Sequence, residues 1–112
     1  MGRAAREKGN KGELEVAHLL KGAGFDADRT PNSGGLTVKG DLTHDIEGVH
    51  FEVKRQENLR IPTWLRQAAA EAAEGEVPIV VFRQSKRVGR VGEWHACLPF
   101  DALVELLRRG PK

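Results

Sequence analysis

The chain has 112 residues, of which 39% are hydrophobic and 30% charged, and its formal net charge is +2. This length fits one compact domain rather than two, with a core of modest size. No apolar run is long enough to span a membrane, and the first residues lack the apolar stretch of a signal peptide. The single cysteine, Cys97, excludes an internal disulfide and a cysteine-rich zinc site, so we expect an intracellular protein.

The N-terminal part is predicted to be a flexible basic arm, residues 1–9, followed by a folded domain. Residues 11–21 fit an amphipathic helix that glycines end. The apolar stripe of this helix is formed by Val16, Ala17, Leu20 and Ala23. Glu13 falls inside this stripe, whereas Glu15 falls on its polar side. A carboxylate that faces the core needs a partner or a metal ion, so Glu13 is a candidate site residue and Glu15 is expected only to be solvated. The alternative for Glu13 is a frayed helix start, where a carboxylate also favours the helix dipole.

A β-hairpin is predicted after the helix, beyond a short strand over residues 25–29 and a Pro-, Asn- and Gly-rich loop over residues 30–35. The hairpin covers residues 41–55, with Glu47 and Gly48 as its turn. Side chains alternate between the two faces of a strand. The apolar face of this hairpin carries Leu42, His44, Ile46, Val49, Phe51 and Val53. The polar face carries Asp41, Thr43, Asp45, His50, Glu52 and Lys54.

Two acids on the polar face could share a divalent cation. In this pairing Asp41 and Glu52 are diagonal neighbours, with Cα atoms about 7–8 Å apart. Lys54 lies beside them and could orient water or stabilise negative charge, which suits phosphodiester hydrolysis. The alternative is the ordinary solvated face of an antiparallel hairpin. His50 shares this face and could tune the site, but it is expected to be an exposed bystander, whereas His44 is expected in the core.

In the second half of the chain, the sequence predicts a helix over residues 62–74, a buried strand over 77–82 and a strand over 93–98. A last helix is expected to begin at Pro99 or Asp101 and to end near Arg109. The order α, β, hairpin, α, β, β, α indicates an α/β fold with a mixed central β-sheet flanked by helices. Trp64 is expected to pack in a core or an interface rather than to stack on a base.

Basic residues gather at two places on this nearly neutral chain. The first cluster contains Arg3, Arg6, Lys8 and Lys11, and the second contains Arg83, Lys86, Arg87 and Arg90. Both clusters are compatible with contacts to a phosphate backbone, and the alternative for each is a solvated loop or tail.

Three short motifs carry a resemblance to a known family: Lys11-Gly12-Glu13, Gly40-Asp41 and Phe51-Glu52-Val53-Lys54-Arg55. Together they resemble the PD-(D/E)XK nuclease superfamily, and within it the archaeal-type Holliday junction resolvases and their phage relatives. The resemblance implies a restriction-endonuclease-like single domain over residues 10–112. It further implies a homodimeric DNA endonuclease that resolves four-way junctions by paired symmetric nicks. A cytoplasmic location in a bacterial, archaeal or phage-infected host cell is expected.

The resemblance also implies residue roles. The ligands implied for Mg²⁺, for which Mn²⁺ could substitute, are Glu13, Asp41, Glu52 and the carbonyl of Val53. The catalytic residues implied are Glu13, Ser33, Asp41, Glu52, Lys54 and Gln67, of which Gln67 is the weaker match. The residues expected to contact DNA are Arg3, Arg6, Lys8, Lys11, Arg29, Arg55, Lys86 and Arg87. Two alternatives stay open: a flap, fork or DNA-end nuclease on the same scaffold, and a DNA-binding module without catalysis.

Overall fold

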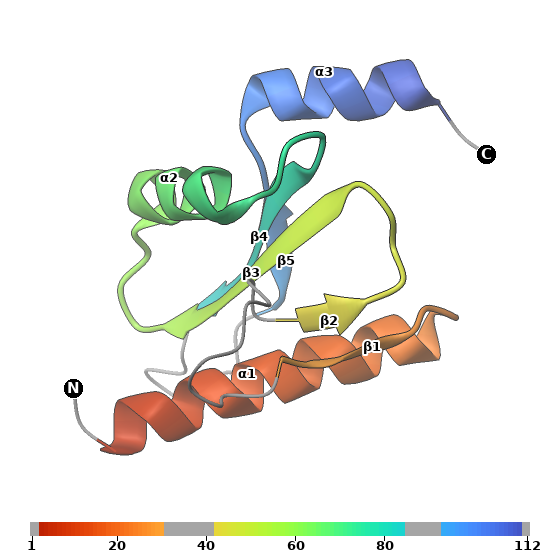
Figure 1. The fold of residues 1–112 in the computed structure, drawn as a ribbon. Coiled ribbons are helices and arrows are strands. Elements are labelled where there is room, and N and C mark those ends of the chain that lie inside the picture. The colour runs from red at the N-terminus through yellow and green to blue at the C-terminus, as the bar shows by residue number, and fades with distance from the viewer. Residues whose placement is uncertain (1–2, 31–41, 85–92, 111–112) are drawn as a thin grey trace.

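The structure is a computed structural model that describes residues 3–30, 42–84 and 93–110, with side chains from residue 11 onward. Its helices are α1 (Arg3–Gly22), α2 (Ile61–Glu71) and α3 (Phe100–Arg109). Its strands are β1 (Ala27–Arg29), β2 (Leu42–His44), β3 (Val49–Gln56), β4 (Val77–Gln84) and β5 (His95–Cys97). Figure 1 shows α1 and α2 on opposite sides of the β3–β5 strands, with α3 beyond the start of β4.

The strands form a mixed sheet and a separate antiparallel pair. The sheet has the order β3-β4-β5, in which β3 and β4 are parallel and β5 is antiparallel to β4. Helix α2 connects β3 to β4, because parallel neighbours need a crossover connection. Strands β1 and β2 pair with each other beside α1. The predicted α/β fold with a mixed sheet and flanking helices is therefore confirmed.

Each face of β3 and β4 is covered by a different helix, and each has its own buried cluster. The cluster under α1 contains Val16, Ala17, Ala27, Leu42, Val49, Phe51 and Val53. The cluster under α2 contains Trp64, Ala68, Val80 and Phe82. Trp64 is therefore a core residue, as expected, and its ring centroid lies 5.9 Å from that of Phe82. Alternation along β3 sends its odd-numbered side chains toward α1 and its even-numbered ones toward α2.

The predicted hairpin over residues 41–55 is wrong in its pairing. Strand β2 pairs with β1, so that Leu42 lies opposite Arg29, and β3 pairs with β4 over its full length. The Glu47-Gly48 turn exists, and Gly48 has a φ of 75°. Parallel pairing with β4 comes with the α2 crossover, so α1 and α2 cover the two faces of β3, which a two-stranded hairpin would leave half exposed.

Helix boundaries also differ from the predicted ones. Helix α1 begins at Arg3 instead of residue 11, so it is continuous across the division between the expected arm and the domain. That division, 1–9 and 10–112, remains a prediction. Helix α2 ends at Glu71, three residues early, and Ala72 has an extended backbone.

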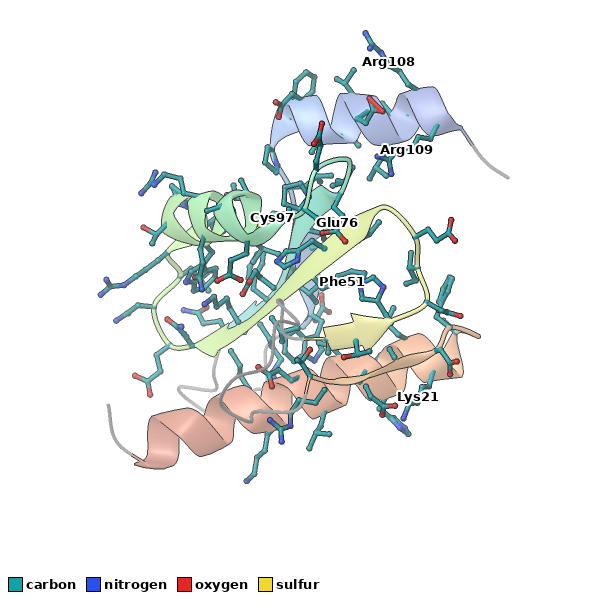
Figure 2. All side chains as sticks on the ribbon, viewed as in Figure 1. Lys21, Phe51, Glu76, Cys97, Arg108 and Arg109 are labelled. Atoms are coloured by element: carbon teal, nitrogen blue, oxygen red, sulfur yellow. The ribbon has the colours of Figure 1, made fainter. Side chains whose placement is uncertain are left out.

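The C-terminal helix is tied to the sheet by one arginine. Arg109 donates hydrogen bonds to the carbonyl oxygens of Gly48 at 3.1 Å and Gly75 at 2.9 Å. Figure 2 shows Arg109 on the side of α3 that faces the strands and Arg108 on the opposite side. These bonds join the starts of β3 and β4 to the end of α3.

Candidate active site

The acid and the lysine of the Glu52-Val53-Lys54 motif lie on the face of β3 that α2 covers. Glu52 is 1% exposed and Lys54 is half-buried. Val53 points to the other face and belongs to the cluster under α1. The strand therefore presents one buried carboxylate and one ammonium group on the same face, two residues apart.

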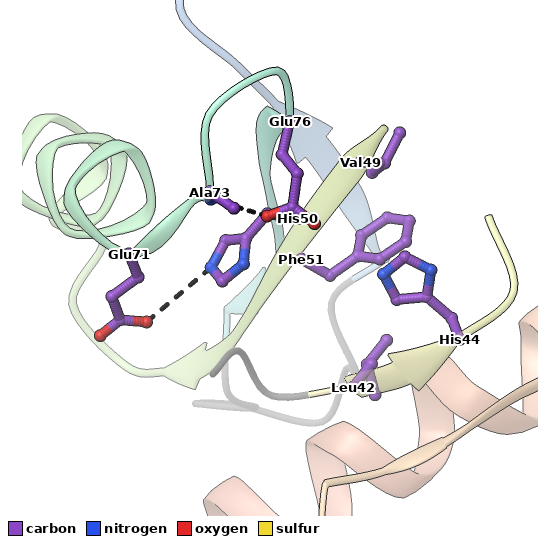
Figure 3. A pocket seen from close by; sticks show the side chains of 8 residues that line it. All are labelled: Leu42, His44, Val49, His50, Phe51, Glu71, Ala73 and Glu76. Carbon is purple, nitrogen blue, oxygen red and sulfur yellow. Dashed lines mark hydrogen bonds and ion pairs between the residues drawn. The ribbon is translucent and has the colours of Figure 1, made fainter. Parts of the chain in front are cut away.

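Two further side chains surround Glu52. The Nε2 atom of His50 lies 3.3 Å from Oε1 of Glu52 and 3.8 Å from Oε2 of Glu71 on α2. One ligand atom from each of these three residues lies within 4.8 Å of the other two. Figure 3 shows His50 and Glu71 facing each other across the space between β3 and α2.

The carboxylate of Glu71 is held in its charged form. Its pKa lies below the ordinary value, and the largest cause is a hydrogen bond with the side chain of Glu52. Burial opposes this effect, whereas a hydrogen bond with Gln67 and electrostatic interactions with His50 and Lys54 reinforce it. Gln67, a candidate from the sequence, is exposed on α2 and thus reaches the site through Glu71.

His50 and Glu71 are the two residues of this group that sequence reasoning misjudged or missed. His50 was expected to be an exposed bystander, and that expectation is wrong, because it is 4% exposed under α2. Glu71 was not singled out. The available signal was its spacing from Gln67, since residues four apart lie on the same face of a helix.

Glu13 lies on α1, which packs against β1 and β3. Its side chain is 18% exposed, and its Oε1 lies 3.9 Å from Nη1 of Arg29 on β1. It is not a member of the group formed by His50, Glu52 and Glu71. The inward orientation expected from its place in the apolar stripe agrees with this low exposure.

Several predicted site residues lie outside the described residues. They are Ser33, Asp41, Lys86 and Arg87. Arg3, Arg6 and Lys8 lie in the first turns of α1, where only the backbone is described. Their expected roles stay predictions. Lys11 is exposed on the same helix.

Glu15 is the centre of a charged network, so the expectation that it only solvates the helix is wrong. Its carboxylate accepts hydrogen bonds from Arg55 at 3.1 Å, Arg83 at 2.8 Å and the indole nitrogen of Trp94 at 3.1 Å. Arg55 and Arg83 are register partners on β3 and β4, so their like charges lie side by side. Arg55, an expected DNA contact, is thus engaged by a glutamate.

The donor atoms on this face suit a divalent cation. Carboxylate oxygens from Glu52 and Glu71 are the ligands that hard cations prefer, and an imidazole nitrogen suits transition metals. Two neighbouring carboxylates also repel each other when both are ionised, and a bound cation offsets this repulsion.

Comparison with known proteins identifies a family over almost the whole chain. The family model described as "Phage putative PDDEXK endonuclease" matches residues 4–110. A search of curated proteins found no match. The family is one of endonucleases, for which DNA is the substrate, and PD-(D/E)XK nucleases typically depend on divalent metal ions. Within the described ranges, no helix combines the length and the apolar character needed to cross a bilayer.

Proposed function

Since the chain belongs to the phage putative PDDEXK endonuclease family, we propose that it is a metal-dependent, structure-selective endonuclease that resolves four-way DNA junctions by paired symmetric nicks. The observation that carries this proposal is the Glu52-Val53-Lys54 motif on β3, whose acid is buried and whose lysine shares its face. A buried carboxylate beside an ammonium group is an arrangement that enzymes use to position water and charge.

The proposed ligands of a Mg²⁺ ion, or of Mn²⁺ in its place, are Glu13, Asp41, Glu52 and the carbonyl of Val53. When bound, such an ion polarises a phosphoryl oxygen and lowers the pKa of water. Lys54 would orient the attacking water and stabilise the negative charge that develops on the phosphate. Ser33 would act near the scissile phosphate. Gln67 would act beside the site, through its hydrogen bond with Glu71. The products would be a 5′-phosphate and a 3′-hydroxyl.

DNA would be held mainly through its phosphates. Lys11 is exposed on α1, the helix that also carries Arg3, Arg6 and Lys8. These residues, with Arg29, Arg55, Lys86 and Arg87, are the proposed contacts. Resolution of a junction requires two symmetric cuts, which a two-fold homodimer would supply, one site from each copy.

The test is cleavage of an end-labelled four-way junction in Mg²⁺ by the full chain. Lys54→Ala and Asp41→Asn should each lower the rate about a hundredfold or more, as loss of a charge-stabilising group does in other enzymes. Lys21→Ala is the matched control, since Lys21 is exposed on α1 and pairs with Asp28 at 2.7 Å. The control should cut at the wild-type rate. A Lys54→Ala variant that also cuts at that rate would overturn the role of Lys54.

The alternative is a flap, fork or DNA-end nuclease with the same metal site. Matched flap, fork and linear duplex substrates in the same assay separate these activities, because only a junction resolvase makes paired nicks in opposed strands. Tight binding of branched DNA without any metal-dependent nick would instead favour a non-catalytic DNA-binding module.

A further inference from the structure

His50 and Glu71 form, with Glu52, a group of potential metal ligands that the proposed nuclease chemistry does not use as a set. Glu52 and His50 come from β3, and Glu71 comes from α2. His50 and Glu52 are 4% and 1% exposed. Glu71 keeps 36% of its side chain exposed, so the group reaches from the interior to the surface.

The spacing of the three ligand atoms fits coordination to one ion. Bond lengths near 2.1 Å to nitrogen and oxygen place neighbouring ligand atoms about 3.0–3.4 Å apart in octahedral or tetrahedral shells. The separations from Nε2 of His50 are 3.3 Å to Glu52 and 3.8 Å to Glu71. Glu71 is the outermost of the three, on a helix surface, so a small rotation of its side chain would close the remaining gap.

An adjoining pocket gives the group access to solvent and room for water ligands. The pocket has a volume of about 320 Å³, and both His50 and Glu71 line it. Figure 3 shows their side chains together with Glu76, whose carboxylate accepts a hydrogen bond from the backbone of Ala73. A cation with three protein ligands needs waters to complete its shell, and this space can hold them.

We propose that His50, Glu52 and Glu71 bind a first-row transition-metal dication such as Mn²⁺, at a second position that shares only Glu52 with the ion assigned to Glu13 and Asp41. The imidazole of His50 favours a transition metal over Mg²⁺ or Ca²⁺, because these metals prefer nitrogen ligands more strongly. Glu52 has two oxygens and serves both ions. The site goes beyond the proposed function, because it requires neither DNA nor cleavage.

The probe is Mn²⁺ alone, added to the full chain without DNA. Pulsed electron paramagnetic resonance should detect ¹⁴N coupling from a histidine nitrogen to bound Mn²⁺ in the wild type. His50→Gln should abolish that coupling, and titration calorimetry should show Mn²⁺ affinity at this site falling at least tenfold. Glu71→Gln should lower the affinity similarly while keeping the nitrogen signal at saturation.

Two matched variants complete the design. Glu76→Gln changes an acid of the same pocket that is outside the ligand group, and it should leave Mn²⁺ affinity within twofold of wild type. Asp41→Asn removes a ligand of the proposed nuclease ion and should keep the nitrogen coupling. Circular dichroism confirms that each variant is folded.

The proposal is overturned by a wild type without nitrogen coupling, by coupling that persists in His50→Gln, or by coupling that disappears in Asp41→Asn. The proposal is also overturned if His50→Gln and folded Glu71→Gln both bind Mn²⁺ with unchanged affinity. Cleavage is not a readout here, so a protein that cuts no junction can still bind Mn²⁺ at His50. Conversely, an active nuclease can lack this site.

Discussion

Replacing Glu15 by glutamine should destabilise the fold, because this one carboxylate neutralises two arginines that the sheet places side by side. Arg55 and Arg83 are register partners on parallel strands about 4.8 Å apart. Both donate to Glu15, and Arg83 is only 8% exposed. The guanidinium of Arg83 also lies 5.5 Å from the ring centroid of Trp94. Loss of the negative charge leaves two adjacent cations without a counter-charge from α1.

The magnitude follows from burial. Removing one partner of a fully buried ion pair costs about 3–5 kcal/mol. The side chain of Glu15 is 34% exposed, and glutamine keeps one oxygen that can accept a hydrogen bond, so solvent and the amide recover part of this loss. We expect the free energy of unfolding to fall by about 2 kcal/mol. For a domain of this size that lowers Tm by about 8 °C.

The assay is urea unfolding of both proteins, followed by far-ultraviolet circular dichroism, with thermal melting as a second measurement. Glu105→Gln is the matched control, because Glu105 is also a helical acid and pairs only weakly, at 3.8 Å, with Arg109. An exposed pair of this kind contributes about 0.5 kcal/mol or less. If the unfolding free energy of Glu15→Gln lay within about 0.5 kcal/mol of the wild-type value, the Glu15 network would contribute no more than an exposed ion pair, and the prediction would be refuted.

Two further predictions concern helix packing and acid stability. Gly22→Ala should stabilise the protein by about 0.5 kcal/mol through helix propensity, since a Cβ there meets nothing within 4 Å. Gly12→Ala should destabilise it by about 1 kcal/mol, because its Cβ would lie 3.2 Å from that of Arg55. Chemical denaturation measures both changes, and equal effects would contradict the packing of α1 on β3. The lowered pKa of Glu71 contributes stability above the ordinary carboxyl pKa, and this is lost as pH falls through the folded-state pKa. Glu71→Gln should therefore lose more stability relative to wild type at pH 7 than at pH 3. If the difference in unfolding free energy between the two proteins did not depend on pH, the lowered pKa of Glu71 would be refuted.

Local patterns predicted the burial of side chains well. The 3.6-residue period placed Val16 and Ala17 on the buried face of α1, and the two-residue period placed Val49, Phe51 and Val53 on one face of β3. These periods follow from the geometry of a single element, so they can be read without knowing its neighbours.

Strand pairing could not be read in the same way. The Glu47-Gly48 turn and the alternation on both sides of it favour a hairpin, yet β3 pairs with β4, whose residues lie beyond α2 in the sequence. The register that places Arg55 beside Arg83, and thereby gives Glu15 its role, exists only after that distant pairing. The burial of His50 has the same origin, because α2 covers it only once β4 is in place. Each of these misses is a consequence of one non-local contact.

Side chains at odd and even positions of β3 face different helices, so residues of the core and residues of the candidate site lie on opposite faces of the strand. Phe51, Val53 and Arg55 face α1, where they form the core and the Glu15 network. His50, Glu52 and Lys54 face α2, where the charged groups meet Glu71. A strand with both faces covered can hold ionisable groups on one face at low exposure, because the other face supplies the apolar burial that holds the strand in place. We therefore expect substitutions at odd positions of β3 to act first on folding, and substitutions at even positions to act first on the proposed binding of ions.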